Sequence, residues 1–107
     1  MNHVTAPDLA AWLADPARPS PLLLDVREPW EFDTCKIEGA TLIPMHTIPA
    51  RIEELDDEAE IVCICHHGAR SMQVAAFLER HGFTNVTNLT GGVHAWAVQV
   101  DSAMPKY

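Results

Sequence analysis

The stretch Glu60–Ser71, with the sequence EIVCICHHGARS, decides the fold. Its first half is rich in β-branched side chains, which suit a packed strand. Two histidines and a glycine follow Cys65 and suit a tight loop, and an apolar periodicity typical of a helix begins near Arg70. The stretch therefore predicts a buried strand, a short loop and a helix, with a cysteine where the strand ends.

A cysteine in this position is a candidate nucleophile. The start of a helix presents unpaired N–H groups and a partial positive charge, and successive loop amides can form an anion-binding nest. Together they would stabilise a thiolate, a persulfide or a bound oxyanion. We therefore interpret Cys65 as the reactive group, against the alternative of a cysteine that only fills space in a buried strand.

The rest of the chain alternates between strand-like and helix-like segments. Leu22–Val26 is a continuous apolar run, as expected of a strand buried on both faces. Shorter strands are expected at Thr41–Pro44 and Asn85–Leu89, and a first helix is expected after Thr5, whose hydroxyl can cap it. This alternation predicts an α/β fold with a parallel sheet.

Length and composition limit the class of protein. The 107 residues fit one domain, 1–107, and no apolar run approaches the roughly 20 residues that span a bilayer. The net charge of −8 argues against nucleic acid as a partner. No signal peptide is visible, and the three cysteines are an odd number, with Cys63 and Cys65 too close for an easy disulfide. We therefore expect a cytoplasmic protein that meets no membrane.

Three motifs, in order, resemble the signatures of the rhodanese family. Cys65–Ser71 resembles the active-site loop Cys-x-x-Gly-x-Arg-Ser, and Asp25–Phe32 resembles the second signature. Thr90–Trp96 resembles the closing signature, which has paired glycines and a following tryptophan. The resemblance is strongest over residues 22–96. It implies a rhodanese-like fold, a mostly parallel five-stranded sheet with helices on both faces.

The resemblance also implies a chemistry, that of a rhodanese-type sulfurtransferase. In that mechanism Cys65 attacks the outer sulfur of thiosulfate, sulfite leaves, and a Cys65 persulfide remains. A thiol, cyanide or a sulfur-relay protein then takes the sulfur. The implied partners are thus small sulfur-containing anions and thiol acceptors, and no metal or organic cofactor is needed.

The loop supplies the expected substrate-binding residues. Arg70 is a permanent cation that would orient an anionic donor. His66 and His67 lie on the rim of the loop, where they can donate hydrogen bonds to a departing sulfite. Ser71 is expected to cap the following helix rather than to bond to the persulfide. The whole set is His66, His67, Gly68, Ala69, Arg70 and Ser71.

Asp25 and Arg27 are expected to support the site. They follow an inner strand at the carboxyl edge of the sheet, where open α/β sheets bind ligands. Because unpaired buried charges are rare, we expect the two side chains to hold loop backbone together rather than to act in catalysis.

One departure from the family pattern involves Cys35-Lys36, where most members have Gly-His. Cys35 is either an idle, partly buried side chain or a resolving cysteine that traps Cys65 as a disulfide under oxidation. A redox role for Cys63 is equally open.

Three other functions compete with sulfur transfer by an enzyme. Phosphatases related to rhodanese use a larger Cys-x5-Arg loop, whereas four residues separate Cys65 from Arg70. Cys63, Cys65, His66 and His67 offer soft metal ligands, but without the paired spacing of zinc sites. A non-enzymatic persulfide carrier or redox sensor, acting with a protein partner, is the strongest alternative.

Overall fold

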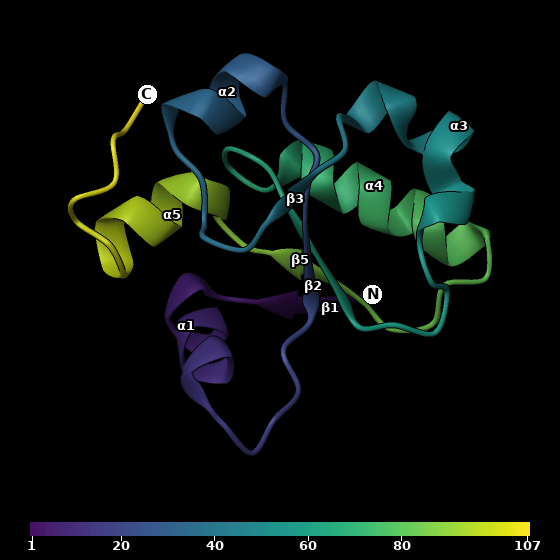
Figure 1. The fold of residues 1–107 in the computed structure, drawn as a ribbon, viewed down its shortest axis with the longest axis horizontal. Coiled ribbons are helices and arrows are strands. Elements are labelled where there is room, and N and C mark those ends of the chain that lie inside the picture. The colour runs from purple at the N-terminus through teal and green to yellow at the C-terminus, as the bar shows by residue number, and fades with distance from the viewer.

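The computed structural model describes residues 1–107, in which five strands alternate with five helices (Figure 1). The strands are β1 (Asn2–Val4), β2 (Leu22–Asp25), β3 (Thr41–Leu42), β4 (Ile61–Ile64) and β5 (Val86–Leu89). The helices are α1 (Ala6–Ala14), α2 (Pro29–Thr34), α3 (Ile48–Arg51), α4 (Ala69–Arg80) and α5 (Gly92–Gln99). The short 3-10 turns η1 (Met45–Thr47) and η2 (Ile52–Glu54) flank α3. None of these helices combines the length and the apolar character needed to cross a bilayer.

All strand pairs in the sheet are parallel, in the order β1-β5-β4-β2-β3. The predicted α/β class and five-stranded sheet are confirmed. The sequence did not reveal β1, which pairs with β5 in the register Asn2↔Thr87 to Val4↔Leu89. It is a three-residue edge strand with an exposed start, so it leaves no apolar run in the sequence.

Strand β4 divides the core into two layers because its side chains alternate between the two faces of the sheet. Val62 and Ile64 belong to the core that packs against α1 and α5, where Trp96 is buried as expected. Cys63 and Cys65 belong to the core on the opposite face, which packs against α3 and α4. Figure 1 shows α1 and α5 on the left of the sheet and α3 and α4 on its right, so helices cover both faces.

The first helix begins as the sequence predicts. The Oγ1 atom of Thr5 accepts a hydrogen bond from the backbone N–H of Asp8 at 3.3 Å.

The helix α4 also ends as the sequence predicts, at Gly82, which has φ +90°. Phe83 then donates its backbone N–H to the carbonyl of Leu78 at 3.1 Å. This is the return hydrogen bond typical of a glycine-terminated helix.

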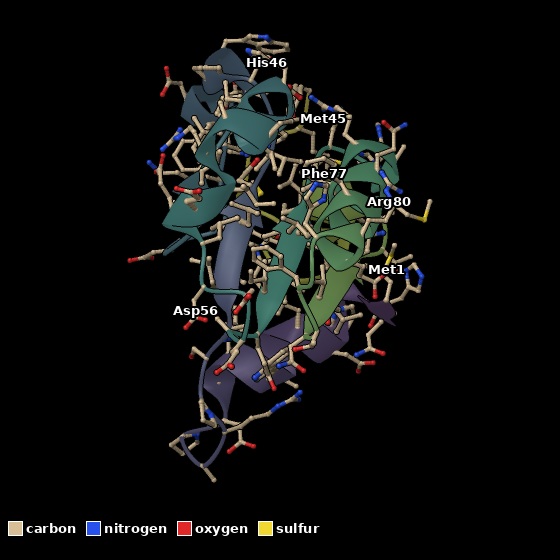
Figure 2. All side chains as sticks on the ribbon, turned by 90° about the vertical axis from the view of Figure 1, so that its right-hand side faces the viewer. Met1, Met45, His46, Asp56, Phe77 and Arg80 are labelled. Atoms are coloured by element: carbon tan, nitrogen blue, oxygen red, sulfur yellow. The ribbon has the colours of Figure 1, made fainter.

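The surface beside α4 carries an apolar groove of about 230 Å³. Figure 2 labels three of the residues that line it, Met45, Phe77 and Arg80. Met45 and Phe77 line it from η1 and α4, with Arg80. Its lining includes no cysteine or histidine. The chemistry-bearing side chains instead gather at the carboxyl edge of the sheet.

Candidate active site

Cys65 directly follows β4 and is 1% exposed. Its Sγ atom accepts a hydrogen bond from the backbone N–H of Gly68 at 3.0 Å. Gly68 is the N-cap of α4 and has φ +108°, a conformation that other residues rarely adopt. The glycine thus turns the loop back on itself, so that its amide points at the sulfur.

Further amides surround this position without partners. The backbone N–H groups of His67, Ala69 and Arg70 donate no hydrogen bond within the protein. N–H groups in the first turn of a helix point out of its start, which here is the side of the Cys65 loop. With the Gly68 amide they provide the donors that stabilise a thiolate, a persulfide or an oxyanion.

The expectation that Ser71 caps α4 is wrong. The N-cap is Gly68, and Ser71 lies inside the helix and is fully buried. Its Oγ atom lies 3.3 Å from Cys65 Sγ, 3.2 Å from the Gly68 carbonyl and 2.5 Å from Asn88 Oδ1. Since a hydroxyl has one proton, Ser71 donates to one of these three acceptors at a time. It is therefore placed to bond to the Cys65 sulfur.

The loop is also fixed to the start of α5. Val93 donates its N–H to the carbonyl of Cys65 at 3.0 Å, and His94 donates to that of His66 at 3.1 Å. Gly92 makes this approach possible, because a Cβ there would overlap both carbonyl oxygens. The paired glycines of the closing motif thus serve the Cys65 loop as well as the turn into α5.

Arg70 forms a bidentate ion pair with Glu31 of α2. Its two terminal nitrogens lie 2.6 and 2.8 Å from the carboxylate oxygens. The hydrogen bonds from Arg70 are the main reason that the pKa of Glu31 falls to about 2, and the carboxylate in turn raises the pKa of Arg70. Arg70 therefore ties the Cys65 loop to α2, and only the part of the guanidinium not taken up by Glu31 can meet a substrate.

Sequence reasoning assigned no role to Glu31. The sequence did contain a signal, since Glu28 and Glu31 have the spacing of a capping box. In the structure the N–H of Glu28 donates to Glu31 Oε1 at 3.0 Å. The capping contact orients the carboxylate that receives Arg70.

Asp25 and Arg27 are fully buried and paired with each other. Arg27 donates from Nε to Oδ1 at 2.9 Å and from a terminal nitrogen to Oδ2 at 2.7 Å. Its other donors reach the backbone carbonyls of Glu31 at 3.2 Å and Cys35 at 2.7 Å. This geometry fits the supporting role, because the pair holds the backbone of the α2 segment beside the loop.

The C-terminal segment lies against the site, which its sequence did not indicate. The Tyr107 hydroxyl accepts from Arg27 at 2.9 Å and donates to Glu31 Oε2 at 2.7 Å, and the C-terminal end lies beside α2 (Figure 1). The Tyr107 ring stacks on His66, with centroids 3.9 Å apart. Burial raises the pKa of Tyr107 to about 12. The tyrosine is thus a neutral bridge between two buried charges.

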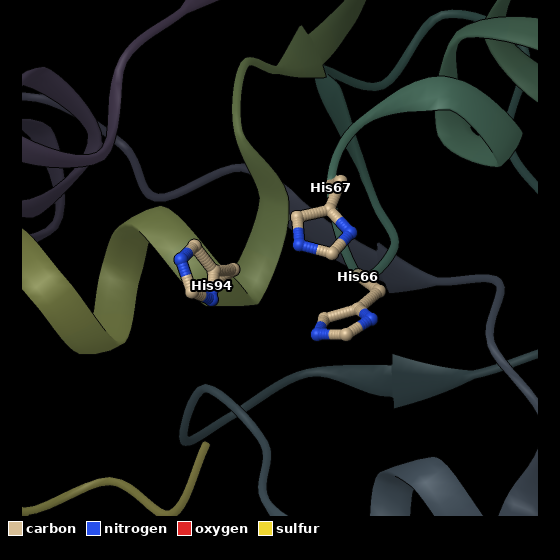
Figure 3. A group of neighbouring side chains, drawn as sticks. All are labelled: His66, His67 and His94. Atoms are coloured by element: carbon tan, nitrogen blue, oxygen red, sulfur yellow. The ribbon is translucent and has the colours of Figure 1, made fainter. Parts of the chain in front are cut away.

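His66 and His67 lie on the rim of the loop, the first half-buried and the second exposed. Burial and the neighbouring His67 lower the pKa of His66. His94 of α5 reaches the same place and was not predicted as part of the site (Figure 3). The ring centroids of His67 and His94 are 5.1 Å apart.

The other two cysteines are buried and free. Burial raises the pKa of Cys63 to about 12, so this side chain is a neutral thiol inside the core and a poor metal ligand. Cys35 packs in the core on the opposite face of the sheet from Cys65. That placement favours the idle interpretation of Cys35 over the resolving one.

A hollow of about 500 Å³ lies away from Cys65. Glu60 and Asn85 line it, and these residues precede β4 and β5. It therefore lies at the amino edge of the sheet, opposite the cysteine.

The geometry of the Cys65 loop agrees with the outcome of comparison with known families. Residues 5–99 match the rhodanese-like domain. The chain belongs to this family. The match covers all three motifs and all five helices, from α1 to α5.

Relatives with assigned names place the chain among proteins of sulfur transfer. A sulfurtransferase of Allochromatium vinosum is 39% identical over 97 residues, which cover 91% of this chain and 89% of that protein. The thiosulfate sulfurtransferase GlpE of Pseudomonas entomophila is 33% identical, covering 70% of this chain and 69% of GlpE. The putative sulfur carrier protein YrkF of Bacillus subtilis is 38% identical over 69% of this chain and 40% of its own length.

A solved structure shows the same fold. The rhodanese-like domain protein of Staphylococcus aureus superposes with a TM-score of 0.84 at 31% identity, covering 100% of this chain and 99% of that one. Sulfur transfer in general is therefore supported by fold, family and the names of relatives.

Proposed function

We propose that this chain, as a single rhodanese domain, transfers a sulfane sulfur from thiosulfate or a similar anionic donor to a thiol or cyanide acceptor through a persulfide on Cys65. The observation that carries the proposal is the buried Sγ atom held 3.0 Å from the Gly68 amide at the start of α4. The unpaired amides of His67, Ala69 and Arg70 add donors for a negative charge.

The proposed reaction uses these contacts in two steps. The Cys65 thiolate attacks the outer sulfur of thiosulfate, a new S–S bond forms, and the old S–S bond breaks as sulfite leaves with its electron pair. Cyanide then attacks the terminal sulfur, so that thiocyanate forms and the Cys65 thiolate returns. The loop amides stabilise the negative charge on sulfur at each stage.

Size and charge favour sulfur transfer over phosphate hydrolysis. The loop between Cys65 and Arg70 is one residue shorter than that of the related phosphatases, and Glu31 already occupies both terminal nitrogens of Arg70. A phosphate monoester would need that guanidinium free for bidentate contact.

The three free cysteines suit a reducing compartment, and we propose that the reaction takes place in the cytoplasm.

Intact-protein mass spectrometry after incubation with thiosulfate tests the proposal. Wild-type protein should gain about 32 Da, one sulfur atom added to the activated thiol, and should lose it when cyanide is added. Cys65→Ser should gain nothing, while the matched control Cys63→Ala, altered two residues earlier, should behave as wild type. A gain that persists in Cys65→Ser would refute the assignment.

A persulfide carrier that works with a protein partner is the second candidate, favoured by the name of the B. subtilis relative. Carrier and enzyme share the persulfide and differ in what removes it. Steady-state thiocyanate production with repeated turnover supports the enzyme. A stable persulfide that small acceptors discharge slowly, and a sulfur-relay protein discharges fast, supports the carrier.

A further inference from the structure

We propose that His66, His67 and His94 form a binding site for a zinc-class divalent metal ion beside the Cys65 loop. The three imidazoles gather from two separate elements (Figure 3). His66 and His67 follow β4, and His94 lies in the first turn of α5. The proposal does not depend on sulfur transfer, because none of the three side chains has to react with sulfur.

The backbone fixes these histidines relative to one another. His94 donates its N–H to the carbonyl of His66 at 3.1 Å, and Val93 donates to that of Cys65 at 3.0 Å. Gly92 leaves no room for a Cβ between the two segments, so the approach is close. The ligands are thus held on rigid, hydrogen-bonded backbone rather than on independent loops.

The side-chain geometry is close to that of a metal site. One ligand nitrogen from each histidine lies within 4.8 Å of the other two. Tetrahedral zinc with Zn–N bonds near 2.0–2.1 Å needs nitrogens about 3.4 Å apart. His67 and His94 are exposed, so modest ring rotations can close the remaining gap.

The ring nitrogens are also available. None of those on the three side chains forms a hydrogen bond or ion pair within the protein, whereas His81 uses Nδ1 to reach the Phe77 carbonyl at 2.8 Å. Lys106 lines a crevice together with His66 and His94, but it is exposed and can turn its charge into solvent. Imidazole ligands suit zinc, copper and nickel, and three of them leave a fourth position open, as in catalytic zinc sites.

The site differs from the metal alternative that the sequence suggested. It does not use Cys63, whose side chain is in the core. It lacks the carboxylate or carbonyl partners that usually hold metal-bound histidines in place. We therefore expect reversible binding, with the fold intact after the ion is removed by a chelator.

Calorimetric titration of EDTA-treated, reduced protein with zinc chloride tests this site. Wild type should bind one ion, and His94→Gln and His67→Gln should each bind at least about tenfold more weakly, since loss of even an outer-shell partner costs about that much. The matched control His46→Gln changes an exposed histidine on η1 at the edge of the molecule (Figure 2) and should bind as wild type.

Cys65→Ser distinguishes a histidine site from a thiolate site. It should keep wild-type zinc affinity, and the cobalt-substituted protein should lack a sulfur-to-metal charge-transfer band. Circular dichroism of each variant shows that it has folded. Absence of one-to-one binding, unchanged affinity in both His94→Gln and His67→Gln, or loss of binding in Cys65→Ser would overturn the proposal.

Discussion

Neutralising Glu31 tests the ion pair that ties the Cys65 loop to α2. Glu31 is 4% exposed and accepts both terminal nitrogens of Arg70. Its pKa falls from 4.5 to about 2, and each pH unit corresponds to about 1.4 kcal/mol. The ionised carboxylate would thus stabilise the fold by about 3 kcal/mol, and by nearer 2 kcal/mol once solvent around the one-third-exposed Arg70 is allowed for.

Glu31→Gln should therefore lower the free energy of unfolding by about 2 to 3 kcal/mol at pH 7. The amide keeps the size of the side chain and an oxygen for the Glu28 N–H, so the variant removes mainly the charge. Because the pKa of Glu31 is depressed in the folded state, its stabilisation is complete above pH 4.5 and is lost as the pH falls towards about 2. The gap between wild type and variant, that is, the difference in their free energies of unfolding, should therefore narrow as the pH falls from 4.5 towards 2.

Urea unfolding followed by tryptophan fluorescence at pH 7, 5 and 3.5 measures the gap. Glu54→Gln is the matched control, because Glu54 makes a similar bidentate pair with Arg51 at 2.8 and 2.9 Å, but on the exposed surface. Solvent screens that pair, so the control should change little. Equal losses in the two variants, or a gap for Glu31→Gln that is the same at pH 7 and pH 3.5, would refute the reasoning.

Three further variants test contacts of the Cys65 loop and of the C-terminal segment. Gly92→Ala should unfold more easily and form persulfide far more slowly than Gly39→Ala, because both have positive φ but only Gly92 is pressed against the Cys65 loop; urea unfolding and thiosulfate loading measure the two effects. Ser71→Ala removes the hydroxyl 3.3 Å from the sulfur and should cost about 1–2 kcal/mol of stability, with slower loading; wild-type loading would contradict this. Tyr107→Phe loses two hydrogen bonds and should lower the free energy of unfolding by about 1 kcal/mol, which corresponds to a few degrees in melting temperature. An unchanged melting temperature would count against the bridge.

The sequence predicted those parts of the structure that depend on local pattern. The apolar runs of β2 and β4 and the glycine that ends α4 have clear signatures, and Cys65 lies where a strand meets a helix, as expected. The sequence did not predict β1, because a three-residue strand at a sheet edge needs little apolar surface. The Ser71 cap was wrong because the left-handed conformation at the start of α4 selects Gly68 instead.

The remaining site residues depend on contacts between distant segments. Glu31 meets Arg70 across 39 positions of the chain, and Tyr107 meets Arg27 across 80. His94 joins the loop only because α5 packs its first turn against it. No periodicity or spacing within one segment reports such contacts, so the sequence predicted the position of Cys65 more readily than its surroundings.

The charges around Cys65 cancel in pairs, which determines how the site would bind an anionic donor under the proposed function. Arg27 is neutralised by Asp25, and Arg70 by Glu31. Neither guanidinium is a free counter-ion, so the donors left for a negative sulfur are mainly backbone amides at the start of α4. Backbone amides have fixed positions, so they stabilise an anion whose size matches the loop. They cannot move to contact a larger anion, as a flexible side chain can. The paired charges therefore act as the frame that holds the amides in place, and under the proposed function the size of the loop would select the substrate.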